Sequence, residues 1–260
     1  SGSVFVRGLG DRYNMTTLNG LPLASNNAAQ KNIDLSIFST DIVENIGVSK
    51  TFNAKNYGDF GGANINIDSK NFTGQPYLAV NFSFGGNTNT FETNDFYLQE
   101  GPSWSGFHSV NPPSNPATTN DWGSSWNRKT NNFKFNGGLN INGGRSFELG
   151  EEGRLNAFFT LGFDNSSSFN SGNSRGKVGA DGYTRQDFKK DSYSYNTNTT
   201  AMGVLNYRMN SNHKFTFTSL FLNSSDQSHD EYNGFDIEFD NDVTNNENGV
   251  GFIQRNTFTE

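Results

Sequence analysis

The sequence of 260 residues lacks cysteine, so the chain has no disulfide bond and no thiolate nucleophile or metal ligand. It also lacks any run close to the roughly 20 apolar residues that a transmembrane helix needs. Basic residues are scattered and number 19 against 26 acidic ones, which gives a formal net charge of −7. This balance argues against binding to a phosphate backbone, and we expect no nucleic acid partner.

No secretory signal peptide opens the chain, because Ser1 begins a polar segment that runs directly into a short apolar stretch. An exported protein needs such a signal. For an exported protein, we therefore expect the native N-terminus to lie upstream of Ser1.

Residue patterns that carry catalysis are absent from the sequence. The three histidines, His108, His213 and His229, are far apart and do not have metal-ligand spacing. No nucleophile elbow, phosphate-binding loop or complete dinucleotide fingerprint occurs. We expect no catalytic residue and no enzymatic activity.

What the chain does contain is a high share of strand-forming and turn-forming residues. Aromatic residues make up 14% of the chain, including 25 Phe, and glycine contributes 29 residues. Aromatics favour strands, whereas glycine favours turns and close backbone approach. The mean hydropathy of −0.71 is low, but the strands of a transmembrane β-barrel are only half apolar. Composition therefore predicts a mainly β fold.

The first 72 residues are typical of a small α/β unit with short strands. Asn19-Gly20 is a strong tight-turn dipeptide, and Gly61-Gly62 predicts a close approach of two backbones. Strands are predicted at 4–6, 16–18, 46–49 and 63–68, and a helical turn or two over 34–48.

From residue 73 onward, long stretches alternate between an apolar face and a small or polar face. This alternation predicts about six antiparallel strands. The stretches that show it are 78–85, 133–142, 155–163, 201–207, 215–221 and 250–258.

The connections between these stretches differ in length. Tight turns are predicted at 150–153 and 209–213, and long polar loops at roughly 86–131, 165–192 and 224–247. Outer-membrane barrels have short turns at one end and long loops at the other. A soluble sandwich also alternates, but it gives no reason for loops that are long on one side only.

The pattern thus favours a membrane barrel whose Phe, Leu and Val face lipid and whose Asn, Ser and Gly face the lumen. Tyr77, Phe147 and Tyr207, near strand ends, are candidates for an interfacial aromatic girdle. Ordinary cross-strand packing is the alternative for each of them.

Four motifs in the first 70 residues resemble the plug domain of TonB-dependent receptors. A strand ending in Arg-Gly is matched by VFVRG at 4–8, and an Asn-Gly strand with a nearby Pro by TLNGLPL at 17–23. The form Ile-Glu-x-Ile-x-Val-x-Lys is matched by IVENIGVSK at 42–50, and a Gly-Gly strand by GGANINIDSK at 61–70. The stretch GLGDRYN at 8–14 is similar to a subgroup common among Bacteroidetes and some proteobacteria.

This resemblance implies a plug domain at 1–72, with its beginning missing, followed by the start of an outer-membrane β-barrel at 73–260. It implies that Arg7 and Glu44 hold the plug in place through charged hydrogen bonds; an exposed or plug-internal ion pair is the alternative. The family's barrels have 22 strands around a plugged lumen. Six strands cannot enclose a domain, so we expect a piece of a larger barrel.

A loop near 96–126 holds Tyr97 and all three tryptophans, Trp104, Trp122 and Trp126. Exposed aromatic rings suit sugar rings or hydrophobic ligands, which makes these four residues candidates for ligand binding. Packing of the loop onto itself is the alternative.

A second loop is acidic, with carboxylates that suit Ca²⁺. Its weak candidate ligands are Asp236, Glu238, Asp240 and Asp242, with Glu247 nearby. The spacing does not fit an EF-hand, and a solvated acidic loop is the alternative. No other cofactor is expected.

The resemblance implies TonB-dependent import of a scarce solute across the bacterial outer membrane, with TonB–ExbB–ExbD as the partner complex. The solute would be an iron chelate, a glycan, a peptide or a cobalamin, and the loop aromatics favour a glycan. An outer-membrane lipoprotein is a further expected partner, and lipid surrounds the barrel. Two alternatives stay open: a receptor-like component of a surface or secretion complex without transport, and a soluble β-rich binding module.

Overall fold

The computed structural model describes residues 5–25, 30–35, 38–54, 56–72, 74–99, 102–107, 114–115, 118, 128–132, 134–150, 152–176, 178–180, 182–236 and 247–259, the last range by its backbone. Two main sheets organise these residues, and the expected mainly β fold is confirmed. No described helix is long and apolar enough to cross a membrane.

The smaller sheet lies in the N-terminal part of the chain and has the strand order β2-β1-β4-β3. Its strands are β1 (Met15–Leu18), β2 (Leu21–Pro22), β3 (Val43–Ser49) and β4 (Asn64–Ser69), preceded by the 3₁₀ turn η1 (Asp11–Tyr13). β1 and β4 are parallel, and the other two pairs are antiparallel. We call residues 5–72, as far as they are described, the plug.

The tight turn predicted at Asn19-Gly20 joins β1 to β2. Both residues have positive φ, 51° for Asn19 and 84° for Gly20, as a type I′ hairpin turn requires. The prediction of a strand at 4–6 is wrong for the described residues, since Val6 forms only an isolated bridge with Leu9. Arg7 and Gly8, between Val6 and Leu9, have positive φ, so the chain turns directly after Val6.

The larger sheet has the order β12-β11-β10-β9-β8-β5 and is not closed. Its strands are β5 (Tyr77–Gly85), β8 (Asn136–Leu149), β9 (Gly153–Arg175), β10 (Gln186–Arg208), β11 (Lys214–Asp236) and β12 (Glu247–Thr259). All neighbours are antiparallel, and the ladders from β5 to β12 have no shift in register. We call this sheet the wall.

The unshifted register places residues of one parity on one face of the wall. Val80, Ile141, Leu161, Ala201 and Phe221 stand directly opposite one another across five strands. This outer face carries exposed apolar side chains such as Phe82 and Phe217, with exposed fractions of 66% and 63%. An exposed apolar face of this kind suits contact with lipid, as the alternation predicted.

The tight turns at 150–153 and 209–213 are confirmed, because Leu149 pairs with Gly153 and Arg208 pairs with Lys214. The long loops are shorter than predicted, because the strands extend into them. β9 continues to Arg175, β10 begins at Gln186 and β11 continues to Asp236. Regular apolar alternation marks only part of each strand, whereas the backbone ladder continues into stretches rich in Ser and Asn, where aromatic residues such as Phe169 are interspersed.

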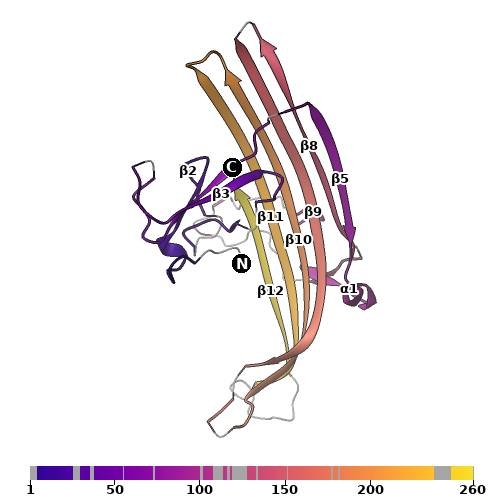
Figure 1. Cartoon of the computed structure of the whole chain (residues 1–260). Helices are drawn as coiled ribbons and strands as arrows, with labels where there is room; N and C mark the ends of the chain where they lie inside the picture. The colour runs from indigo at the N-terminus through magenta and orange to yellow at the C-terminus, as the bar shows by residue number, and fades with distance from the viewer. Residues whose placement is uncertain are drawn as a thin grey trace.

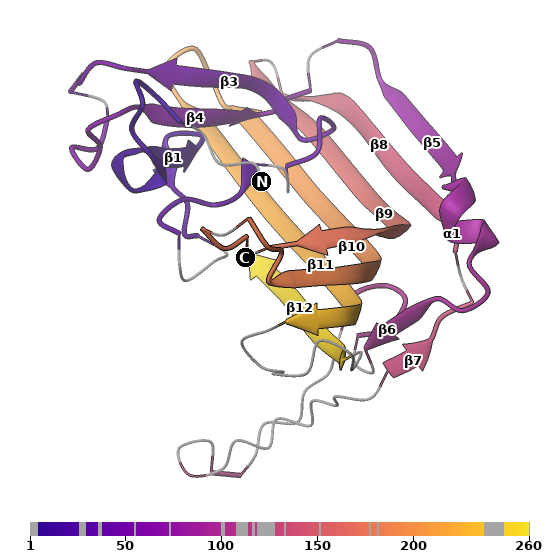
Figure 2. The same cartoon turned by 90° about the horizontal axis from the view of Figure 1, so that it is seen from below.

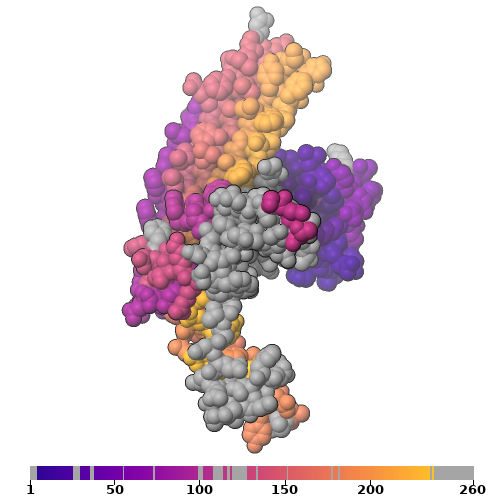
Figure 3. All heavy atoms as spheres, turned by 180° about the vertical axis from the view of Figure 1, so that it is seen from behind, coloured from indigo at the N-terminus to yellow at the C-terminus, as the bar shows by residue number. Residues whose placement is uncertain are grey.

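The plug lies on the concave side of the curved wall, and the far ends of β9, β10 and β11 bend toward the same side (Figure 1). The connection between β5 and β8 contains α1 (Thr88–Glu92), β6 (Tyr97–Gln99) and β7 (Arg128–Thr130). These elements lie away from the plug, toward the other side of the wall (Figures 2 and 3). The wall is thus covered on its inner face by the plug and, beyond the exposed apolar band, on its outer face by the β5–β8 connection.

Gly144, on the inner face of β8, provides a test of how the plug is seated. A Cβ added there would lie 2.2 Å from Cδ2 of the plug residue Phe72, whereas a Cβ added at Gly203 of β10 meets nothing within 4 Å. We expect Gly144→Ala to lower the free energy of unfolding by about 1–3 kcal/mol through overpacking. Thermal unfolding of the purified full-length protein, with Gly203→Ala as the control, measures this. Equal stability of the two variants would contradict the described seating.

Candidate functional site

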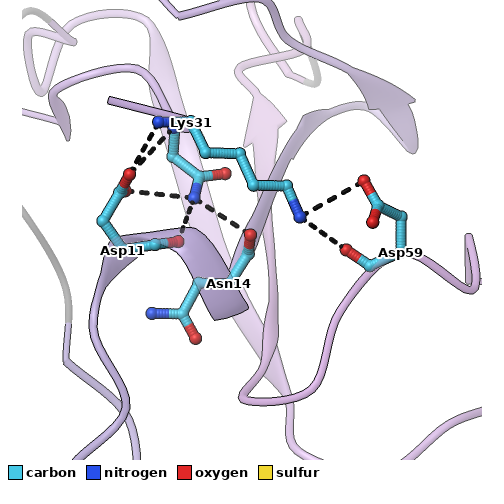
Figure 4. A network of polar contacts seen from close by, with 5 residues as sticks. Asp11, Asn14, Lys31 and Asp59 are labelled. Carbon is cyan, nitrogen blue, oxygen red and sulfur yellow. Dashed lines mark hydrogen bonds and ion pairs between the residues drawn. The ribbon is translucent and has the colours of Figure 1, made fainter. Parts of the chain in front are cut away.

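The plug is stiffened by a polar network around Asp11 (Figure 4). The Asp11 carboxylate accepts hydrogen bonds from the backbone N of Lys31 at 2.8 Å and from Asn32 at 3.3 Å. The buried Asn32 side chain donates to the backbone oxygens of Asp11 and Asn14, and Lys31 pairs with Asp59 at 3.2 Å. This network ties η1 to two distant segments of the plug.

Gly61-Gly62 permits the close backbone approach that the sequence predicted. Both backbone N atoms donate to the carbonyl of Tyr13, at 2.9 and 2.8 Å. A Cβ on Gly62 would lie 2.3 Å from Oδ1 of Asn14, the atom that accepts from Ala63 N at 3.1 Å. The role of the pair is therefore to allow packing inside the plug.

The plug meets the wall through a buried apolar contact, which we call the seat. Ile42 and Phe72 of the plug pack against inner-face residues of three strands, and Phe38, Val43 and Leu220 border the cluster. The wall residues of the seat are Phe158, Met202, Val204 and Leu222, each at most 5% exposed. Sequence reasoning expected a polar lumen face and polar partners for the plug, and at this place the expectation is wrong.

A chain of hydrogen bonds runs beside the seat. The backbone N of Asn71 donates to Glu44 Oε2 at 3.3 Å, and the Asn71 side chain accepts from the Asn206 amide of β10 at 2.7 Å. Asn206 is 8% exposed and also accepts from the Thr216 hydroxyl of β11 at 2.7 Å. Among the described residues, Glu44 is thus linked to the wall through Asn71, and its anchoring role stays a prediction.

Arg7, the other proposed anchor, is exposed and forms no hydrogen bond or ion pair with another described residue. It lies in the turn between Val6 and Leu9 with φ of 55°. The anchoring role of Arg7 stays a prediction.

Two of the predicted ligand-binding aromatics lie among the described residues, in the β5–β8 connection. Tyr97 packs edge-on against the rings of Tyr193 and His229, with centroid distances of 5.5 and 5.9 Å. Arg128 of β7 lies 4.4 Å above the Tyr97 ring. The Tyr97 ring is thus part of a packed cluster and not an isolated platform.

Trp104 is 69% exposed and makes an edge contact with Phe163 on the outer face of β9. Its backbone carbonyl accepts a hydrogen bond from the hydroxyl of Tyr195 at 2.5 Å. Of the two predicted rings that the structure describes, Trp104 is therefore the more available to a ligand. Trp122 and Trp126 lie outside the described residues.

The β5–β8 connection is held to the wall by a second apolar cluster of buried aromatic residues. Phe96 and Leu98 pack with Tyr193 and Tyr195 of β10, and Phe169 of β9 borders them. Arg128 adds an ion pair to Glu231 at 2.8 Å, and His229, fully buried, lies 3.1 Å from the same carboxylate. These wall residues have the parity of the outer face, so this cluster and the seat lie on opposite faces of the wall.

Burial in this cluster, with the carboxylates of Glu231 and Asp191 nearby, raises the pKa of Tyr193 to about 12. Burial and the neighbouring Asp95 also raise the pKa of Tyr97. Both phenols therefore stay neutral under ordinary conditions.

Of the weak Ca²⁺ candidates, Asp236 is described and is 4% exposed at the end of β11. Glu238, Asp240 and Asp242 lie outside the described residues. Among the side chains that the structure describes, no group of three or more His, Asp or Glu could hold a metal ion.

The seat residues were missed because sequence reasoning assigned one apolar face to each strand. In β9 the adjacent Phe158 and Phe159 place an apolar side chain on each face of the strand. This pair was the signal in the sequence for a buried inner face. Nothing comparable marks Asn71 or Asn206, since asparagine is common throughout the chain.

Comparison with known families agrees with the geometry of the plug. Residues 1–64 match the family model for the TonB-dependent Receptor Plug Domain. This match supports assignment of the chain to the TonB-dependent receptor family. Searches of the curated proteins and of the solved structures found no match.

The hydrogen bond between Asn71 and Asn206 can be tested as a coupling between plug and wall. Asn206→Ala leaves the Asn71 and Thr216 side chains without their described partner, so we expect a loss of about 1–3 kcal/mol in unfolding free energy. A double-mutant cycle with Asn71→Ala should show that the two effects are not additive. Asn212→Ala, in the exposed turn at 209–213, is the control. Strict additivity would contradict direct contact.

The raised pKa of Tyr193 predicts a loss of stability in alkali. Above pH 10 the unfolded tyrosine ionises freely, whereas the folded one resists ionisation up to about pH 12. The contribution of Tyr193 to the free energy of unfolding is therefore fully present below pH 10, and it is lost as the pH rises toward 12. The absorbance of tyrosinate should show a late-ionising group that disappears in Tyr193→Phe. The same late phase in that variant would refute the assignment.

Proposed function

We propose that the chain is the plug and the first barrel strands of a transporter that imports a scarce solute across the bacterial outer membrane in a TonB-dependent manner. The observation that carries the proposal is the plug-domain match at 1–64 together with the seating of that unit on the concave face of the wall. The exposed apolar outer face supports a location in lipid.

In this proposal the seat is a gate. The plug occupies the lumen while Ile42 and Phe72 are buried against the wall. TonB, energised through ExbB and ExbD, would supply the work that separates these surfaces after a ligand has bound. The step is a conformational change without covalent chemistry, and no enzymatic activity is part of it.

The solute class stays open among iron chelates, glycans, peptides and cobalamins. The exposed Trp104 ring is the feature of the described residues that favours a glycan, because an aromatic face can stack on a sugar ring. An outer-membrane lipoprotein partner and membership of a Bacteroidetes-like subgroup belong to the same proposal.

The alternative of a receptor-like component without transport differs in its coupling to TonB. Deletion of TonB in the native host would abolish solute accumulation by a transporter and leave a structural component unaffected. A soluble binding module would be recovered without detergent.

Cross-linking of plug to wall beside the seat tests the gate directly. The chain has no cysteine, and the Asn71 and Asn206 side chains touch at 2.7 Å. In an N71C/N206C variant, a short bifunctional methanethiosulfonate should join plug to wall and reduce TonB-dependent accumulation of the solute at least tenfold, with recovery on reduction. The solute is first identified by comparing the native host with its deletion strain.

The matched control joins two wall positions. Thr216 Oγ1 and Asn206 Oδ1 are also 2.7 Å apart, so an N206C/T216C variant forms a cross-link that does not reach the plug. It should import normally. Undiminished import by the cross-linked N71C/N206C variant would refute a gate at this position.

A further inference from the structure

A cavity of about 310 Å³, lined by both polar and apolar residues, lies between the plug and the inner face of the wall. Ser39 and Asp41, from the plug segment before β3, form one side of it. Inner-face residues of β5, β8, β9 and β10 form the other side. The cavity therefore lies on the seam between the two parts that the proposed gate separates.

Glycine creates the room for this cavity. Asn81, Asn140, Gly162 and Thr200 stand side by side across four strands, and Ser83, Gly138 and Asp164 form the next row. Each row thus contains one glycine. The Ser83 hydroxyl occupies the space above Gly138, 2.5 Å from an added Cβ, so Gly162 is the position that leaves room. Glycine inside a strand weakens the sheet and often marks a place that a ligand or another backbone approaches closely.

The space above Gly162 can be measured. A Cβ at this position would lie 3.4 Å from Nδ2 of Asn140 and 3.9 Å from Cβ of Thr200. A first carbon therefore fits in ordinary contact, and a longer side chain would extend into the cavity. The φ of Gly162 is one that other residues adopt, so backbone conformation does not require glycine at this position.

The lining is rich in oxygen and has a negative balance. Asp41 and Asp164 contribute carboxylates, whereas asparagine and serine contribute amides and hydroxyls, and the described lining contains no Lys, Arg or His. Phe82, Leu139 and Phe163 border the cavity but belong to the outer-face parity. Asp164 and Ser83 are exposed, so the hollow is open to water. Two carboxylates that face the same hollow attract cations and repel anions.

The cavity directly adjoins the seat. Asp41 immediately precedes Ile42, which is buried in the seat, and Phe38 borders the same cluster. On the wall, Thr200 and Gly162 are the next cavity-lining positions along the inner face beyond Met202 and Thr160. Movement of the plug segment 38–42 would break the apolar contact and widen the cavity at the same time.

We propose that this cavity is a hydrated subsite on the solute path, which accepts cationic or neutral hydroxyl-rich groups and excludes anionic ones. The part played in a solute path rests on the proposed function. The charge preference rests on the lining alone. For the transported solute, this disfavours an anionic chelate and favours a neutral glycan or an amine-bearing compound.

Charged thiol reagents test the cavity. In the purified full-length protein, freed of any cysteine outside these 260 residues, an S83C variant places an isosteric thiol in the lining. Its modification rate by a trimethylammonium methanethiosulfonate is compared with the rate by a sulfonate analogue. Both rates are divided by those of S211C, whose thiol lies in the exposed turn at 209–213.

The normalised preference for the cationic reagent should be on the order of tenfold. It should fall to within about twofold of the S211C value when D41N and D164N are added. A Gly162→Leu substitution should slow both reagents at S83C several-fold by filling the cavity. Gly203→Leu, on the outer face, should not.

Failure of this proposal differs from failure of the transporter proposal. An S83C thiol that reacts without charge preference, or not at all, overturns the cavity whatever cross-linking of the seat does to import. A clear preference in a protein whose cross-linked plug still imports supports the cavity as a cation-accepting site and counts against the gate.

Discussion

The arrangement depends on an unbroken antiparallel register across the wall. Successive residues of a strand face opposite sides, and a slip of one residue would exchange the faces along the whole strand. Because β5, β8, β9, β10 and β11 pair without a shift, Val204 and Leu205 reliably point to different environments. The seat, the lipid-facing band and the cluster that docks the β5–β8 connection all follow from this constraint.

The inner face combines an apolar seat with polar surroundings. This combination suits a plug that has to separate from the wall during transport. Ile42 and Phe72 bury apolar area, which favours association without directional bonds. The Asn71–Asn206 contact fixes position. An applied force that breaks the Asn71–Asn206 hydrogen bond and exposes the apolar seat meets a limited barrier. A network of buried ion pairs would instead cost several kcal/mol per ion to desolvate and rebuild.

The sequence predicted the strands that have one apolar face, because residues alternate in polarity when the two faces of a strand lie in different environments. It placed the Asn19-Gly20 hairpin and both tight turns, since these depend on local backbone conformation. It did not predict the full length of β9, β10 and β11, because frequent Ser and Asn interrupt the apolar alternation there and the aromatic residues of that part face the distant β5–β8 connection. It also missed the seat, because Phe158 and Met202 acquire an apolar partner only when a distant segment, residues 38–72, packs on them.

The most direct measurement of the central claim is an immunoblot of heated and unheated membrane fractions from the native host. If the wall is part of a closed outer-membrane barrel that holds this plug, the protein will be found in the outer-membrane fraction. It will also change its electrophoretic mobility on heating, because a closed barrel resists detergent until it is heated. A band in the soluble fraction with the same mobility before and after heating would contradict the account.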